Sequence, residues 1–166
     1  YLFGVNETVR EYVRLTQELD ARDTPVVLVL FGDHKPWMGN GGSVYEEMGI
    51  DFDTSTLAGF RNYYATPYLI WANRAAKEVL GADFTGDGGD FSPCFLMTRL
   101  FDACGWAGPG YMQLSRAMRD ISPLLHTNGL FLHDGVLTSV LSDTDRSFYR
   151  SWLAVQYYRE HVAAYS

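Results

Sequence analysis

The stretch PVVLVLFGDH, residues 25–34, decides how the rest of the chain is interpreted. Its first seven residues are apolar and rich in valine, without the polar alternation that is typical of a half-exposed strand. Such a run predicts a strand that is covered on both faces, as in a parallel sheet. Gly32 then lets the backbone turn sharply, and Asp33 and His34 follow directly. The sequence therefore predicts a buried strand that delivers an acid and an imidazole at its end.

The segments on both sides of this strand predict an α/β protein. Before it, apolar residues recur at helical spacing from Val9 to Leu19, and Asn6 is a suitable cap for that helix. After it, residues 38–59 have the composition of a long loop, with a short helix at Val44–Met48. Tyr68 to Trp71 predicts a second short strand. A helix, a strand and a polar loop in succession are typical of the α/β class.

The second half of the chain predicts three helices and one strand. A capping serine followed by proline starts a helix that runs from Ser92 to Gly105. A further helix is expected from Tyr111 to Met118, and a short strand from Leu130 to Leu132. The last helix begins after a cap at Ser142 or Asp143. Its core face is predicted to carry three apolar residues at helical spacing, Phe148, Trp152 and Val155.

Composition and charge exclude several classes of protein. The chain has 166 residues, of which 47% are hydrophobic and 20% charged, as expected for a single globular domain over residues 1–166. Its net charge is −7 and its basic residues are scattered, so nucleic acid is not expected as a partner. No apolar run approaches the ~18 residues of a membrane span. The glycine- and aspartate-rich segment 81–92 lacks the glutamate that ends an EF-hand loop, which favours a solvated turn.

Asp33 and His34 are the candidate metal ligands. In an open α/β sheet, ligands bind at the carboxyl ends of the strands, where the predicted strand places both residues. Successive side chains diverge along a strand, but in the turn that follows they can converge on one point. A carboxylate oxygen and an imidazole nitrogen suit a divalent cation such as Zn²⁺ or Mn²⁺. The alternative interpretation, a capping aspartate beside an exposed histidine, stays open.

Other chemistry-bearing side chains are weaker candidates. Lys35 and Trp37 follow the two ligands closely and could line a substrate cleft, or they could be a solvated lysine and a packed tryptophan. The loop hydroxyls have no adjacent base and are not expected to act as nucleophiles: Ser43, Thr54, Ser55 and Thr56. The remaining histidines are expected to be surface or capping residues: His126, His133 and His161. The sequence contains no Gly-x-Ser-x-Gly motif, so an unrelated α/β hydrolase is not expected.

Four sequence blocks occur in an order that resembles a known family. They are VVLVLFGDHKPWMG at 26–39, YYATPYLIWANRAAKEVLG at 63–81, SPCFLMTRLFDACGWAGPGYMQL at 92–114 and FYRSWLAVQYY at 148–158. Their shared features are Gly-Asp-His before a proline, a Thr-Pro-aromatic strand that ends in Trp-x-Asn, a Ser-Pro helix start and a closing Gln-Tyr pair. Together they resemble the C-terminal part of the lipoteichoic-acid-synthase-like sulfatases and phosphoglycerol transferases of the alkaline phosphatase superfamily.

The resemblance implies a fold, a site and an activity. The fold would be the C-terminal portion of an alkaline-phosphatase-like α/β/α sandwich, and Asp33 and His34 would coordinate the catalytic metal, which is Mn, Mg, Zn or Ca. The intact protein would be a metal-dependent phosphoglycerol transferase or sulfatase-like hydrolase that acts on phosphate or sulfate esters in the cell envelope. Preceding spans would anchor it to the membrane, with this domain outside the cytoplasm.

The resemblance does not extend to the residues that carry out the reaction. In the family, the nucleophile, a further acidic ligand and a substrate-binding histidine belong to the N-terminal half of the catalytic domain, which precedes the matching segment. We therefore assign no catalytic residue and expect the isolated chain to be inactive, with the missing N-terminal half as its partner. The alternative is a non-catalytic folding or binding module derived from such a domain.

Overall fold

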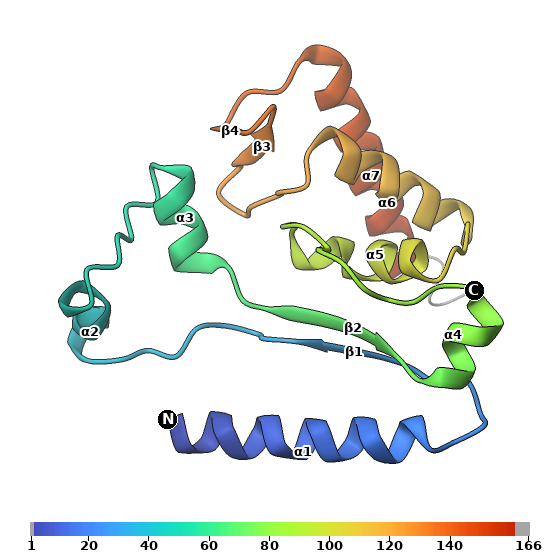
Figure 1. The fold of residues 1–166 in the computed structure, drawn as a ribbon. Coiled ribbons are helices and arrows are strands. Elements are labelled where there is room, and N and C mark those ends of the chain that lie inside the picture. The colour runs from blue at the N-terminus through green and yellow to red at the C-terminus, as the bar shows by residue number, and fades with distance from the viewer. Residues whose placement is uncertain (1, 162–166) are drawn as a thin grey trace.

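The computed structural model describes residues 2–161 and has a mixed α/β architecture (Figure 1). The α-helices are α1 (Leu2–Asp20), α2 (Ser43–Glu47), α3 (Leu57–Tyr64), α4 (Arg74–Leu80), α5 (Leu96–Ala103), α6 (Gly110–Ile121) and α7 (Asp143–His161). The strands are β1 (Val27–Phe31), β2 (Tyr68–Ala72), β3 (Phe131–His133) and β4 (Val136–Thr138). No helix in the described part of the chain is long and apolar enough to cross a membrane. The predicted α/β class is confirmed in this general form.

β1 and β2 form an antiparallel pair. The register places Val27 opposite Ala72 and Phe31 opposite Tyr68. The prediction that β1 belongs to a parallel sheet and is covered on both faces is therefore wrong for the described residues. Its strand neighbour runs in the opposite direction, and its first four side chains are only half-buried. A valine-rich run indicates that both faces of a strand are apolar. It does not indicate whether the neighbouring strand is parallel or antiparallel.

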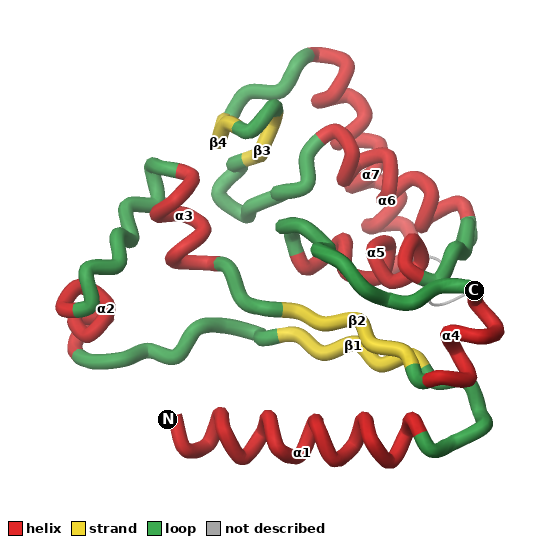
Figure 2. Tube along the Cα trace, in the orientation of Figure 1, coloured by secondary structure: helices red, strands yellow, loops and turns green. Residues whose placement is uncertain are grey.

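Helices lie on both sides of the β1–β2 pair (Figure 1 and Figure 2). On one side, α1 and the two strands line an apolar groove of about 640 Å³. On the other side, α5 contributes Arg99 and Ala103 to a second groove, which β2 and the segment 82–88 complete. The cover on the α1 side is loose, because α1 has no buried residue. The α1 side of β1 is apolar, in agreement with its apolar side chains, whereas the second groove contains Asp83, Asp87 and Arg99 and adjoins β2.

α1 begins at Leu2, four residues before the predicted cap. Asn6 lies inside this helix, so its prediction as the helix cap is wrong. Ion pairs on the exposed surface stabilise the helix locally, since Arg14 lies 2.8 Å from both Glu11 and Glu18, within one turn on either side. The helix therefore forms from its own short-range contacts, while its apolar stripe stays largely accessible to solvent.

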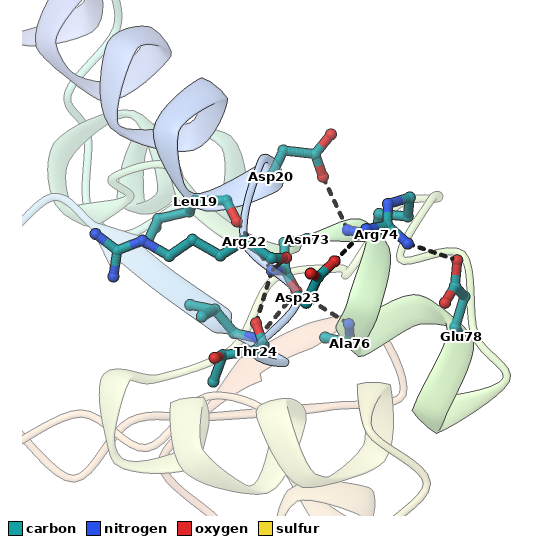
Figure 3. Close-up of polar contacts among 10 residues, drawn as sticks. Leu19, Asp20, Arg22, Asp23, Thr24, Asn73, Arg74, Ala76 and Glu78 are labelled. Atoms are coloured by element: carbon teal, nitrogen blue, oxygen red, sulfur yellow. Dashed lines mark hydrogen bonds and ion pairs between the residues drawn. The ribbon is translucent and has the colours of Figure 1, made fainter.

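Asn73 joins α1, β1 and α4 at one end of the sheet (Figure 3). Its side chain is fully buried, and its amide group donates to the carbonyl oxygens of Leu19 and Thr24, each at 2.9 Å. The side-chain oxygen accepts from the backbone N–H groups of Val26 and Ala76, also at 2.9 Å. Asn73 thus caps α4 and at the same time fixes the connection between α1 and β1.

The helices of the second half enclose a hydrophobic core. Phe95, Met118 and Trp152 come from three separate elements, and each is at most 3% exposed. The Trp152 indole N–H donates to the hydroxyl of Ser115 at 3.0 Å, so its one polar atom is satisfied inside the core. The predicted core face of the last helix is confirmed for Trp152. It is wrong for Val155, which lies on the accessible side of α7.

Most of the predicted helix boundaries agree with the structure. Pro93 opens a 3-10 turn that leads directly into α5. Ser142 caps α7, because its hydroxyl accepts from the backbone N–H of Asp145 at 3.1 Å. The Ser92 side chain does not cap its helix as predicted. Its hydroxyl instead accepts from the N–H of Leu125 at 2.8 Å and ties the helix start to a distant segment.

α3 and the β3–β4 hairpin differ from the sequence-based expectations. α3 begins within the predicted loop, after Thr56, whose hydroxyl accepts from the N–H of Gly59 at 3.0 Å. The strand predicted at Leu130–Leu132 corresponds to β3, and it continues through a two-residue turn into β4. Asp134 and Gly135 have φ angles of 49° and 77°, the left-handed backbone that tight Asp-Gly hairpins require. Both differences trace to short polar motifs that look like ordinary loop sequence.

Candidate metal site

Asp33 and His34 lie side by side where the chain leaves β1. The Asp33 carboxylate accepts a hydrogen bond from the backbone N–H of His34 at 2.9 Å, which holds the carboxylate beside the imidazole ring. His34 Nε2 lies 3.4 Å from Asp33 Oδ2. The structure therefore brings the two predicted ligands together at the C-terminal end of a strand.

The orientation of the His34 ring leaves one nitrogen free to act as a ligand. Its Nδ1 lies 3.0 Å from the carbonyl oxygen of Lys35, and a carbonyl oxygen can only accept a hydrogen bond. Nδ1 therefore carries a proton when it makes this hydrogen bond, and Nε2 is the ring nitrogen that faces the Asp33 carboxylate. Histidine ligands are commonly held in this way in metal sites. The pair can offer one oxygen and one nitrogen to the same cation.

The pair is exposed and supplies only part of a coordination sphere. The side chains of Asp33 and His34 are 82% and 77% exposed, so the described residues do not enclose them in a cleft. Within residues 2–161, no group of three or more His, Cys, Asp or Glu is placed to hold a metal ion. Catalytic zinc sites use three protein ligands and structural ones use four. The residues present fit two ligands of an open site, and the others must be water or groups from outside these residues.

A second aspartate–histidine pair lies in the β3–β4 turn. His133 Nε2 lies 3.6 Å from Asp134 Oδ2, and His133 Nδ1 lies 3.2 Å from the carbonyl oxygen of Ile121. This pair has a similar spacing between Nε2 and the carboxylate, but the histidine comes first, is held by the distant Ile121 and lies at the end of a three-residue strand of a hairpin. It serves as an internal control for any experiment on metal binding.

Lys35 and Trp37 occupy different environments. The Lys35 amino group donates to the carbonyl oxygen of Asn62 in the last turn of α3, and it lies 6.0 Å from the centre of the Phe52 ring. Partial burial lowers the pKa of Lys35. Trp37, in contrast, is 70% exposed. Lys35 thus ties the loop after the candidate ligands to α3, and a role for either residue in substrate binding stays a prediction.

Thr66 is a neighbour of the site to which the sequence assigned no role. Its hydroxyl donates to the carbonyl oxygen of Gly32 at 2.7 Å. Gly32 in turn donates its N–H to the carbonyl oxygen of Pro67 at 2.9 Å. Sequence reasoning noted the Thr-Pro dipeptide only as the start of the second strand. Thr66 could have been predicted to lie beside Gly32 only if the antiparallel pairing of the two strands had been known.

The other histidines have structural surroundings. His126 packs against the rings of Phe60 and Tyr64, with ring centres 5.2 and 4.6 Å away. His161 stacks on the ring of Tyr157 within α7, with ring centres 4.2 Å apart. The exposed position of His161 agrees with the surface role expected from the sequence, whereas His126 is half-buried and packs in a way that the sequence did not indicate.

Comparisons with protein-family models, with curated proteins and with solved structures found no match to this chain. The structure thus defines a mixed α/β protein with an exposed aspartate–histidine pair at the end of a strand. The resemblance to a family rests on the order of the four sequence blocks alone.

Proposed function

We propose that this chain is part of a metal-dependent phosphoglycerol transferase or sulfatase-like hydrolase, in which Asp33 and His34 are two of the metal ligands. The observation that carries the proposal is the approach of Asp33 Oδ2 and His34 Nε2 to each other at the end of β1. The proposed fold is the C-terminal portion of an alkaline-phosphatase-like α/β/α sandwich. The helices on both sides of β1 and β2 support it.

The two side chains suit a divalent cation, and their chemistry narrows the choice among Mn, Mg, Zn and Ca. When bound, such a cation polarises a phosphoryl or sulfuryl oxygen and activates a nucleophile. The Asp33 carboxylate offers a charged oxygen, and neutral His34 offers a nitrogen. Mg²⁺ and Ca²⁺ prefer sites made of oxygen alone, whereas imidazole suits Zn²⁺ and carboxylate suits Mn²⁺. The donor pair therefore favours Mn²⁺ or Zn²⁺.

The remaining parts of the site would come from outside these residues. The N-terminal half of the catalytic domain supplies the nucleophile, the further ligands and the substrate-binding histidine. Membrane spans before it anchor the protein, so that this domain meets phosphate or sulfate esters of the cell envelope. The exposure of Asp33 and His34 supports a site that another segment completes, because exposed ligands are still free to face an added partner.

A non-catalytic folding or binding module is the alternative function. The position of Lys35 favours it, since its amino group already has the carbonyl of Asn62 as a partner and contributes to local structure. A purely structural module has no need of a metal. Metal binding by Asp33 and His34 therefore distinguishes the two functions.

Titration of the full chain with Mn²⁺ tests the proposal. We expect binding in the micromolar range at best, because a tight site needs three or more protein ligands and the pair supplies two. Calorimetry measures the affinity, and paramagnetic broadening of the His34 ring protons by NMR locates the ion. Asp33→Asn and His34→Gln are each expected to weaken binding by about 10-fold or more.

The second aspartate–histidine pair provides the matched control. His133→Gln removes the same chemical group and should leave the affinity for Mn²⁺ unchanged. Broadening of His133 in place of His34, or no broadening at all, would contradict the metal role of Asp33 and His34. Nanomolar binding that His34→Gln abolishes would instead reveal further ligands within the chain.

A further inference from the structure

We propose that Thr66 is a positioning residue for the candidate metal site, because its hydroxyl fixes the peptide group from which Asp33 and His34 project. This inference rests on the proposed function, in which these two residues are metal ligands. Thr66 lies 34 residues after Gly32 in the chain, just before β2, and the pairing of β1 with β2 brings it to the site.

The contact acts on the backbone directly before the first ligand. The Thr66 hydroxyl donates to the carbonyl oxygen of Gly32 at 2.7 Å, the usual length of a good O–H···O hydrogen bond. That carbonyl belongs to the peptide group that links Gly32 to Asp33. Because a peptide group is planar, the direction of the carbonyl also sets the direction of the Asp33 N–H and the place of its Cα. A hydroxyl on a neighbouring segment therefore orients the first ligand.

A second hydrogen bond holds the other side of Gly32. The N–H of Gly32 donates to the carbonyl oxygen of Pro67 at 2.9 Å. Both peptide groups that flank Gly32 are thus bound to the Thr66-Pro67 dipeptide. The antiparallel ladder, which ends with Phe31 opposite Tyr68, is extended in this way as far as the residue before Asp33.

The absence of a side chain at Gly32 makes this close approach possible. A Cβ built on Gly32 would lie 3.0 Å from the Cβ of Thr66, which is tighter than an ordinary van der Waals contact. A larger residue at position 32 would push Thr66 away and lengthen its hydrogen bond. The glycine before the two ligands therefore permits the hydrogen bonds to Thr66 and Pro67 as well as the turn.

The two ligands are bound to each other but need Thr66 to be held against the sheet. The Asp33 carboxylate accepts from the N–H of His34, and His34 Nδ1 donates to the carbonyl of Lys35. These local bonds do not fix the peptide group between Gly32 and Asp33, which is held by Thr66. Loss of the Thr66 hydroxyl is therefore expected to let this peptide group rotate, so that Asp33 and His34 are held less well for binding one cation.

Two substitutions of Thr66 separate the hydroxyl from the shape of the side chain. Thr66→Val removes the hydroxyl, and Thr66→Ser keeps it. For Thr66→Val we expect Mn²⁺ binding to weaken by about 10-fold, as is usual for residues that hold metal ligands in place. We also expect shifts in the amide NMR signals of Asp33 and His34 in the metal-free chain. Thr66→Ser is expected to restore both measurements to the wild-type values.

Thr138→Val is the matched control for this series. The Thr138 hydroxyl also donates to a carbonyl oxygen, that of Val140 at 3.2 Å, but it lies on β4. Its removal should change neither the Mn²⁺ affinity nor the two amide signals. The indole N–H signal of Trp152, which is bonded to Ser115, reports whether each variant keeps its core.

Several outcomes overturn the inference. One is a Thr66→Val variant with an intact core that binds Mn²⁺ as the wild type does and leaves both amide signals unmoved. Another is a Thr66→Ser variant that behaves like Thr66→Val, since the hydroxyl is then not the active group. If Thr66→Val loses its core, Gly32→Ala takes its place, because the added Cβ displaces Thr66. Unmoved Asp33 and His34 amides in that variant overturn the inference as well.

The failure of this inference can be told apart from the failure of the proposed function. If the wild-type chain does not bind Mn²⁺ at all, the metal role of Asp33 and His34 fails. The amide signals of the metal-free variants then decide alone whether Thr66 orients the pair.

Discussion

At the scale of single residues, Asn73 shows how much of a fold one polar side chain can hold. It is fully buried and satisfies five backbone groups from the segments around it, namely those of Leu19, Arg22, Thr24, Val26 and Ala76. The two N–H groups and the two lone pairs of its side-chain oxygen make the four hydrogen bonds of 2.9 Å, and one N–H is shared with the carbonyl of Arg22 at 3.3 Å. The cost of burying its polar atoms is offset by these partners, so the residue stabilises the junction of α1, β1 and α4.

Asn73→Ala is expected to lower the free energy of unfolding by about 2–4 kcal/mol. Buried polar groups that lose their partners cost about 1–3 kcal/mol each, and water can reach some of the five. Urea unfolding followed by tryptophan fluorescence measures the change. Asn62→Ala is the control, because the Asn62 amide makes one hydrogen bond, to the carbonyl of Asp51 at 2.9 Å. Equal losses in the two variants would contradict the central role of Asn73.

Residue types at the candidate site could be predicted from the sequence, but their partners could not. An apolar run followed by Gly-Asp-His was enough to place Asp33 beside His34 at a strand end. Nothing local indicated the partner of Thr66, which lies 34 residues away, or the partners of Asn73 beyond its own helix, which lie 47 to 54 residues away in the chain. The contact of Lys35 with the end of α3 was unpredictable for the same reason, since it depends on where α3 packs.

At the scale of secondary-structure elements, Asp102 joins α5 to α6. Its carboxylate lies 2.6 Å from Arg116 Nε and 2.7 Å from Arg119 Nη2, and its side chain is 20% exposed. Burial acts to raise the pKa of Asp102, but the hydrogen bonds and charges of Arg119 and Arg116 outweigh it, so the pKa lies below its usual value. The contact between the two helices is therefore strongest while Asp102 is ionised.

Asp102→Asn is expected to lower the free energy of unfolding by about 1–3 kcal/mol at neutral pH, because hydrogen bonds to charged groups are lost. The pKa of Asp102 is lower in the folded than in the unfolded state. Its stabilisation is therefore complete above the ordinary carboxyl pKa of about 4 and is lost as the pH falls through the folded-state value. The wild type and the variant should converge in strong acid.

Denaturant unfolding over a series of pH values measures this convergence. Asp120→Asn is the matched control on α6, because the Asp120 side chain is 68% exposed and lies 3.7 Å from Arg119. Its effect should be small at every pH. A difference between wild type and Asp102→Asn that stays constant from neutral to acid pH would contradict the role of the ionised carboxylate.

Local signals located most elements of the fold but not the way in which they pair. Pro93 and Ser142 marked two helix starts, because proline and a capping hydroxyl act within a single turn. The helix after Thr56 was missed, since its cap stands among other loop-like polar residues. β1 was predicted as a strand, but its antiparallel pairing with β2 was not. That pairing depends on the path of the long connection between the two strands, which the local sequence does not indicate.

At the scale of the whole molecule, two regions differ in how well they are packed. α5, α6 and α7 surround the buried side chains of Phe95, Met118 and Trp152. The β1–β2 pair has a looser cover, since α1 has no buried residue. Asp33 and His34 belong to this looser region, at the end of β1. Substitutions at the candidate site should therefore leave the helical core intact, which makes Trp152 a suitable reporter for them.

The spacing of the paired strands predicts the order in which the two strand pairs form. Residues 32–67 separate β1 from β2, whereas Asp134 and Gly135 alone separate β3 from β4. The entropic cost of closing a loop rises with the logarithm of its length. Bringing β1 and β2 together therefore costs about 2–3 kcal/mol more free energy than bringing β3 and β4 together. A tight hairpin forms in about 1–10 μs, so the β3–β4 pair can precede the β1–β2 pair by a wide margin.

Pulse-labelling hydrogen exchange during refolding is expected to protect the amides of β3 and β4 before those of β1 and β2. Simultaneous protection of all four strands would contradict this order. The same delay applies during synthesis from the N-terminus, because β1 leaves the ribosome before β2 has been made. Asp33 and His34 are thus synthesised before Thr66, and they are expected to reach their final orientation only once Thr66 meets Gly32.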